Sequence, residues 1–253
     1  NMRILLQYFS GQGLVSFVNI AVGILFIRWL PIEDFAIYVL VMLLQTTACV
    51  FSDFGIASGV NTFISRDVKN QAAHAGTLRV AWRLWKRFVP ISIACVFVLA
   101  WFILNPVVQG WRFVIFVVFA ILCGVLQSQI NIKKSVLNAH RDVKGLMRVG
   151  IAECIPRLLL SPLCFIFPNV ELALAINLVG ICAMLCISNR QALKHAYDVS
   201  SRGISDSNLG GFVIPLIPTV IYSLFQGHLG LLILGFYGNS HMVAEVGALG
   251  RLG

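Results

Sequence analysis

Glu153 and Arg157 are the ionisable residues of this chain whose spacing is best suited to chemistry inside an apolar segment. They are four residues apart, so on a helix they share one face, and glutamate on the N-terminal side is the favourable order for pairing. If a helix starts near Met147, Arg157 lies about 15 Å along it, close to a bilayer midplane. Pro156 removes one backbone hydrogen bond there and predicts a kink. Either the pair is closed and structural, or Arg157 lines a cavity and binds an anionic substrate.

Asp53 and Arg28 are two further candidate site residues. Asp53 lies late in an apolar segment, where it either pairs locally or faces a substrate. Arg28 follows the first apolar run, where it either reaches the membrane interface or contributes a second cation to substrate binding. Amide side chains within apolar segments could bind sugar hydroxyls, although in membranes they more often form hydrogen bonds between helices. These amides are Asn19, Gln45, Gln127, Gln129, Asn131 and Asn177.

Other chemistries have no recognisable pattern in the sequence. The seven cysteines all fall in apolar segments without a CxxC spacing, and the five histidines form no HxxxH or HExxH pattern. We therefore predict no metal site and no cofactor. Gly11-Gln12-Gly13 follows no strand and precedes no Lys-Ser/Thr, so it is not a phosphate loop. Without a recognisable Ser-His-Asp or paired-carboxylate arrangement, we do not expect an enzyme.

The elements that must position these residues follow from the composition. Hydrophobic residues make up 58% of the chain, charged residues 11%, and the mean hydropathy is +0.88. Soluble domains usually carry roughly 25% charged residues, so this chain has too few to cover a soluble surface. An ordinary soluble enzyme and a disordered chain are both excluded. The sequence is that of an integral membrane protein.

Runs without charge predict the membrane spans. A helix crosses about 30 Å of hydrocarbon with about 20 residues. Because the alternation typical of barrel strands is absent, we predict an all-α protein with about seven transmembrane helices. An eighth begins near Met242. The predicted spans are 4–27, 36–60, 88–104, 113–132, 149–167, 172–189 and 209–234.

The loop charges predict the orientation. Segments 61–87, 133–148 and 190–208 hold six, five and three Lys or Arg residues, whereas the opposite connections hold only Arg28 and Arg112. This is the positive-inside pattern, with the N-terminus in the cytoplasm. The net charge of +9 is then explained by topology and by anionic lipids, so that nucleic acid is not needed as a partner.

One cytoplasmic segment has an amphipathic pattern. Apolar side chains recur on one helical face, at Leu78, Trp82, Trp85 and Val89. The adjoining face carries Arg79, Arg83, Lys86 and Arg87. Such a segment is typical of a helix lying at the membrane surface, before the span at 88–104. It is either a strut packed on its own bundle or a sensor of lipid composition.

Short motifs resemble one known family. The segment 27–38, read IRWLPIEDFAIY, resembles the turn between the first two spans of polysaccharide-unit flippases, with Ala36 where the family usually has glycine. Ser52-Asp53-Phe54-Gly55-Ile56 resembles their signature at the end of the second span. The stretch 215–247 resembles their seventh span and its turn into the eighth. The chain is thus similar to the O-antigen/polysaccharide exporters of the multidrug/oligosaccharidyl-lipid/polysaccharide superfamily.

The resemblance implies two six-helix lobes around a central cavity. Residues 1–189 would form the N-terminal lobe, 190–208 a cytoplasmic link, and 209–253 the first helix and the start of the second helix of a truncated C-terminal lobe. It further implies that the chain, as a fragment of such a protein, helps to carry a polyprenyl-pyrophosphate-linked oligosaccharide across the bacterial inner membrane by alternating access. Arg157 would counter the pyrophosphate charge, and Arg28 would assist at the outer mouth.

Two other functions are compatible with the sequence. A cation-coupled multidrug exporter of the same superfamily would use carboxylates, and Asp53 and Glu153 are available. A non-transporting membrane scaffold would instead bind other membrane proteins of glycan assembly. An integral-membrane transferase is disfavoured because its catalytic motifs are missing.

Overall fold

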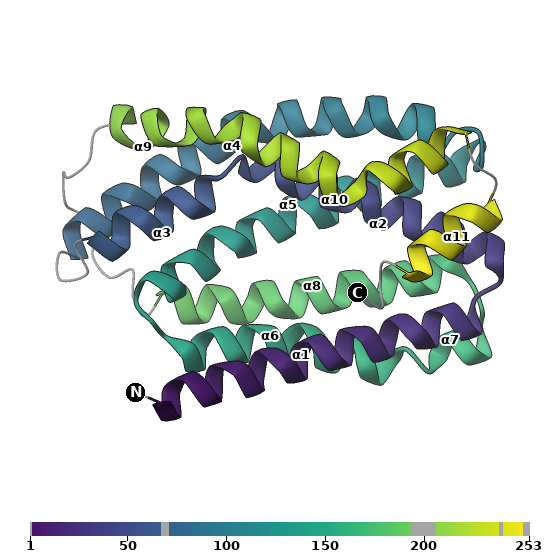
Figure 1. Cartoon of the computed structure of the whole chain (residues 1–253), viewed down its shortest axis with the longest axis horizontal. Helices are drawn as coiled ribbons and strands as arrows, with labels where there is room; N and C mark the ends of the chain where they lie inside the picture. Colours follow the sequence, from purple (N-terminus) through teal and green to yellow (C-terminus); the bar gives the residue numbers. More distant parts are fainter. Residues whose placement is uncertain (1, 67–70, 194–205, 238–239, 250–253) are drawn as a thin grey trace.

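The computed structural model describes residues 2–66, 71–193, 206–237 and 240–249, and these residues form helices and short turns without a strand (Figure 1). The N-terminal helices are α1 (Met2–Trp29), α2 (Ile32–Asp53), α3 (Ile56–Arg66), α4 (Gln71–Ile103) and α5 (Trp111–Ala139). They are followed by α6 (Val143–Leu160), α7 (Leu163–Ile166), α8 (Val170–Leu193) and α9 (Asp206–Val213). A 3-10 turn, η1 (Ile214–Leu216), then leads into α10 (Ile217–Tyr237) and α11 (Ser240–Leu249).

Six helical segments in the described part are long and apolar enough to cross a membrane. They are Ile32–Asp53, His74–Ile103, Trp111–Ala139, Val143–Ile166, Val170–Ala192 and Leu209–Phe236. The chain is therefore an all-α, multi-pass membrane protein. The predicted number of seven spans plus the start of an eighth is not reached: the apolar segment found in α1 is the shorter Val15–Trp29, and α11 has only 10 residues.

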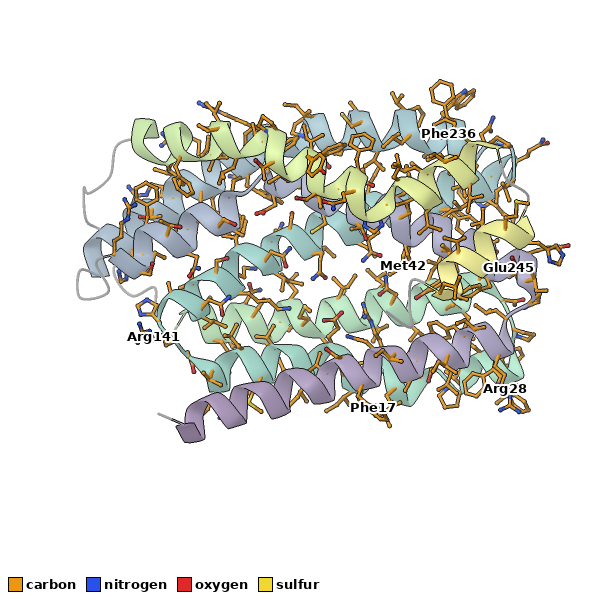
Figure 2. All side chains as sticks on the ribbon, in the orientation of Figure 1. Phe17, Arg28, Met42, Arg141, Phe236 and Glu245 are labelled. Atoms are coloured by element: carbon orange, nitrogen blue, oxygen red, sulfur yellow. The ribbon has the colours of Figure 1, made fainter. Side chains whose placement is uncertain are left out.

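The helix ends gather at two opposite ends of the bundle. The α5–α6 turn carries Arg141 at one end, while Arg28 at the end of α1 and Glu245 on α11 lie at the other (Figure 2). Arg112 and Glu171, at the starts of α5 and α8, form an exposed ion pair of 2.5 Å. This separation agrees with the two sets of loops that the charge pattern predicts.

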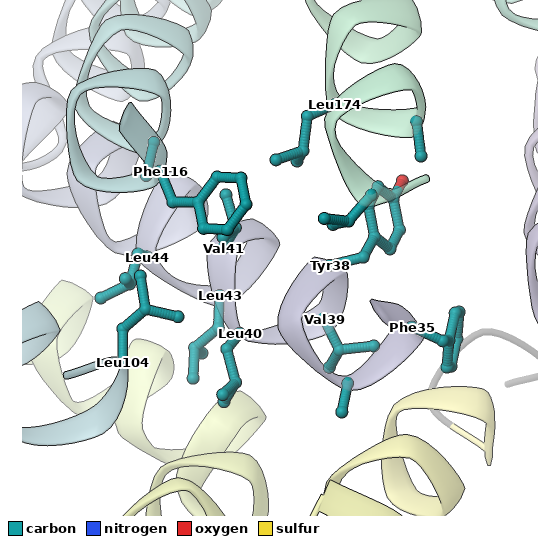
Figure 3. Packing of buried hydrophobic residues seen from close by; sticks show 14 of the residues in the cluster. Phe35, Tyr38, Val39, Leu40, Val41, Leu43, Leu44, Leu104, Phe116 and Leu174 are labelled. Atoms are coloured by element: carbon teal, nitrogen blue, oxygen red, sulfur yellow. The ribbon is translucent and has the colours of Figure 1, made fainter. Parts of the chain in front are cut away.

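Helix α2 is the centre of the bundle, because its neighbours cover it on nearly every side. Most of its residues from Phe35 to Cys49 are buried. Leu40 and Leu44 pack in one apolar cluster with Phe116 of α5, Leu104 after α4 and Leu174 of α8 (Figure 3). A polar side chain in the buried stretch from Phe35 to Cys49 is therefore mostly surrounded by protein, where it must find a partner within the bundle.

Gly124 allows α5 to approach α2 closely. A β-carbon at this position would lie 2.4 Å from the β-carbon of Ala48 and 2.5 Å from the carbonyl oxygen of Gln45. No real β-carbon fits at such distances, so this contact requires glycine, as small residues do at close helix contacts in membranes.

The predicted second span, 36–60, is wrong at its C-terminal end. Helix α2 stops at Asp53, and Phe54 and Gly55 have φ angles of 38° and 84°. Left-handed backbone cannot continue a right-handed helix, so the chain turns and starts α3 at Ile56. The signal for this break is Gly55, since glycine adopts positive φ without strain.

The amphipathic segment is not a separate surface helix. It belongs to α4, which runs without interruption from Gln71 through Pro90 to Ile103. Trp85 packs inward, and its Nε1 donates a hydrogen bond of 2.8 Å to Oγ of Ser128 on α5. The apolar face at Trp85 thus packs on the bundle, as the strut hypothesis requires. The basic residues lie on the same uninterrupted helix as the apolar residues that follow them.

The predicted link 190–208 falls partly outside the described residues. Residues 190–193 extend α8, 194–205 are not described, and α9 begins at Asp206. The start of the last span packs on α3, where a β-carbon at Gly59 would lie 2.9 Å from Cδ1 of Leu209. The predicted span 149–167 consists of α6 and the single turn α7.

Candidate functional site

Glu153 and Arg157 form the ion pair that their spacing predicts. Nη1 of Arg157 lies 2.7 Å from Oε1 of Glu153, and the two side chains are only 16% and 14% exposed. Both lie on α6, one turn apart, in a segment long enough to span the membrane. The pairing neutralises two charges that would otherwise be costly at this depth.

Asn177 on α8 extends the pair to a second helix. Nη2 of Arg157 donates a hydrogen bond to Oδ1 of Asn177. Nδ2 of Asn177 in turn donates to Oε1 of Gln45 on α2, at 2.7 Å. The result is a chain of polar side chains from α6 through α8 to α2. The predicted helix-to-helix role of these two amides is confirmed, but their link to Arg157 was not predicted.

A cavity of about 200 Å³ opens beside this network, and Arg157 and Asn177 contribute to its wall. Its remaining lining residues are Asn19, Val22, Phe26, Tyr38, Met42 and Ile176. These residues come from α1, α2, α6 and α8. The cavity is large enough for several water molecules or a small polar group. It therefore brings a largely buried cation and amide side chains to one partly open space.

Gly180 and Pro156 shape the surroundings of Arg157, the first by leaving space and the second by removing a backbone donor. Gly180 on α8 faces the guanidinium, and a β-carbon there would lie 2.9 Å from Nε. Pro156 lies inside α6 and has no N–H, so the carbonyl of Ala152 lacks its usual donor one turn earlier in the helix. Gly180 was not identified from the sequence, because only the packing of α6 on α8 shows what it faces.

An anion could reach the Arg157 guanidinium only in competition with Glu153. An arginine guanidinium presents five N–H donors in a planar fork that matches carboxylate and phosphate groups. In this structure Glu153 and Asn177 take two of its nitrogens. The described pair is neutral overall, so an entering anion would gain Arg157 by displacing the Glu153 carboxylate.

Asp53 does not belong to this site. Its Oδ1 accepts a hydrogen bond of 3.0 Å from the backbone N–H of Ala57, so it caps the start of α3. Aspartate is a favoured residue for this role because the first N–H groups of a helix have no partner within it. Asp53 thus supports the turn after α2 rather than lining the cavity beside Arg157.

Arg28 is not among the residues that line the cavity beside Arg157. It is exposed in the last turn of α1, at the end of the bundle opposite Arg141 (Figure 2). Of the four candidate residues, the structure therefore joins Glu153 and Arg157 and separates the other two. In the described residues, no three His, Cys, Asp or Glu side chains gather in a way that could hold a metal ion.

Comparisons with protein-family models, with curated proteins and with solved structures found no match to this chain.

Proposed function

We propose that this protein takes part in polysaccharide export, as part of a flippase for a polyprenyl-pyrophosphate-linked oligosaccharide in which residues 1–189 form the N-terminal lobe. The observation that carries the proposal is the Arg157 guanidinium, held by Glu153 and Asn177 at the wall of a cavity inside a membrane-spanning bundle. Intramembrane arginines are costly and mark substrate pathways in many transporters. The motif resemblance at 27–38 and 52–56 supports the same family.

The chemical task explains why an arginine is useful here. A pyrophosphate headgroup carries negative charge that the bilayer core opposes, whereas its isoprenoid tail is compatible with lipid. Arg157 offers planar, multidentate donors to phosphate oxygens, and Asn19 in the same cavity wall offers an amide that suits a sugar hydroxyl. Glu153 keeps the empty site neutral, so that the cation is stored without an unpaired charge.

The cation-coupled exporter receives less support from the described contacts. Its two candidate carboxylates already have partners, because Glu153 pairs with Arg157 and Asp53 caps α3. The membrane scaffold receives no specific observation in its favour. We propose the bacterial inner membrane as the location, with the N-terminus and the Arg141 end of the bundle in the cytoplasm, on the basis of the loop charges.

The proposal is tested by ligand binding to the purified chain in detergent. A polyprenyl-pyrophosphate-linked oligosaccharide should raise the thermal unfolding temperature of the wild-type chain, since a ligand that binds only the folded state stabilises it. The Glu153→Gln/Arg157→Gln double variant should fold but lose this response. Arg157→Lys should respond weakly, because a point charge does not replace the planar fork.

The matched control is the Arg112→Gln/Glu171→Gln double variant. It makes the same chemical change at an exposed ion pair near one end of the bundle, with side chains 61% and 41% exposed. It should respond to the ligand as the wild type does. An undiminished response in the Glu153→Gln/Arg157→Gln variant would remove Arg157 from the substrate path. A response to sodium ions without any response to the lipid-linked sugar would favour the exporter.

A further inference from the structure

We propose that the exposed face of α4 holds one anionic phospholipid, with its headgroup on Lys86 and Arg87 and an acyl chain along the apolar residues that follow. This site lies outside the cavity beside Arg157 and does not depend on the flippase proposal. Helix α4 is continuous from Gln71 to Ile103, so its basic segment and its apolar segment have a fixed position relative to each other.

The headgroup end of the site consists of two adjacent cations. Lys86 and Arg87 are both exposed, and within the described residues neither has an ion pair or a side-chain hydrogen bond. A third cation stands near them, because Nζ of Lys133 on α5 lies 5.6 Å from the ring centre of Trp82, one turn before Lys86. Tryptophan and basic side chains together are typical of the membrane interface.

Asp53 forms no ion pair with Lys86 or Arg87 among the described residues. Asp53 is close in space, since the ring centres of Phe54 and Phe88 are 5.1 Å apart. However, its carboxylate accepts the N–H of Ala57 and serves the α2–α3 turn. The positive charge of Lys86 and Arg87 therefore remains available to an external anion.

The acyl-chain end of the site is an exposed apolar stripe on the same face. Ile91, Val98 and Trp101 follow Arg87 at intervals of four, eleven and fourteen residues, and they are 50%, 54% and 53% exposed. These intervals keep them in line with Arg87 on one side of a helix. Phe97, which is 51% exposed, widens the stripe beside Val98.

The dimensions fit one leaflet of a bilayer. From Arg87 to Val98 the helix rises about 16 Å, at 1.5 Å per residue over eleven residues. Half of a hydrocarbon core of about 30 Å is about 15 Å. A lipid whose phosphate rests on Lys86 and Arg87 would therefore end its acyl chain near Val98. A free phosphate would use only the cations and leave the apolar stripe unused.

The test measures lipid binding to the purified full chain in detergent, by native mass spectrometry and by thermal unfolding. Phosphatidylglycerol should bind and raise the unfolding temperature, whereas zwitterionic phosphatidylcholine should bind much more weakly. Each basic residue near an anionic surface contributes about 1 kcal/mol, so Lys86→Gln/Arg87→Gln should weaken phosphatidylglycerol binding by about 30-fold. Soluble glycerol phosphate should not bind, because it cannot occupy the stripe.

Two control variants keep the result interpretable. Arg66→Gln/Arg141→Gln removes the same charge from two other exposed cations, and it should bind phosphatidylglycerol like the wild type. Lys86→Arg/Arg87→Lys retains both charges and should keep the binding, while its unfolding temperature without lipid checks the fold at these positions. Equal losses in both charge-removing variants, or glycerol phosphate binding as tightly as the lipid, would overturn the proposal.

Discussion

Gly180 on α8 lies against the guanidinium of Arg157 on α6, so closely that a β-carbon on Gly180 would be 2.9 Å from Nε and 3.1 Å from the carbonyl oxygen of Glu153. The glycine therefore makes room for the Arg157 side chain and for the backbone of α6 at Glu153 at once. Its role is steric, since it leaves the volume that a long charged side chain needs inside a packed bundle. The pair on α6 thus depends on the absence of a side chain at Gly180 of α8.

We expect Gly180→Ala to lower the free energy of unfolding. Overpacking a tight contact costs about 1–3 kcal/mol, which exceeds the gain of up to about 1 kcal/mol from alanine in a helix. The measurement is thermal or denaturant unfolding of the purified protein in detergent. Gly230→Ala on α10 is the control, because a β-carbon there meets nothing within 4 Å, and it should be neutral or stabilising. Equal effects at both positions would refute the steric role of Gly180.

Arg157→Ala should destabilise the protein more than the loss of an exposed charge. Its removal leaves Glu153 buried without its ion-pair partner, and breaking a buried pair costs about 3–5 kcal/mol. The Glu153→Gln/Arg157→Gln double variant should recover most of this loss. Its free energy of unfolding should therefore be higher than the sum of the effects of the two single variants predicts. Arg112→Ala is the comparison: its pair with Glu171 is exposed, so the loss should stay below about 1 kcal/mol. A double variant as unstable as Arg157→Ala would show that the pair is not the cause.

Asp53→Ala should weaken the turn between α2 and α3. The side chain caps α3 through the N–H of Ala57, and loss of such a cap costs about 1 kcal/mol. Asp53→Asn should lose much less, because the amide oxygen can still accept that hydrogen bond. The readout is again the free energy of unfolding. If the asparagine variant is as unstable as the alanine variant, then the charge of Asp53 matters rather than the cap.

The orientation of the bundle can be checked by cysteine labelling in intact cells. After the seven natural cysteines are replaced, single cysteines are introduced as Arg141→Cys and Trp111→Cys, both at exposed positions at opposite ends of α5. A membrane-impermeant maleimide should label position 111 from outside and position 141 only after permeabilisation. Labelling of position 141 in intact cells would reverse the orientation.

The sequence was informative about the helices and about contacts within one helix. Charge-free runs predicted the membrane class because hydrocarbon does not tolerate unpaired charges. The i, i+4 spacing predicted the pair of Glu153 and Arg157 because helix geometry alone brings them together. These predictions depend only on local periodicity, and the structure confirms both.

Contacts between helices could not be predicted in the same way. Nothing in the spacing of Gln45, Asn177 and Arg157 indicates that they join, because their meeting depends on how α2, α6 and α8 pack. The end of α2 at Asp53 was missed because hydropathy remains high across the break, whereas the backbone turns at Phe54. The sequence predicted a basic surface helix separate from the span at 88–104, because the charges end near Arg87. The backbone continues there as one helix, α4, so the change in charge did not mark a helix end.

Met42 of α2, labelled in Figure 2, is a lining residue of two separate spaces. It lines the cavity of about 200 Å³ beside Arg157, and it also lines a groove of about 250 Å³ between α2 and α10. Its sulfur accepts a hydrogen bond of 3.4 Å from Nδ2 of Asn177. A rotation of α2, or a new rotamer of this flexible thioether, would enlarge one space at the expense of the other. The cavity beside Arg157 and the groove against α10 therefore share one side chain as a wall, so that a change at Met42 would alter the shape of both.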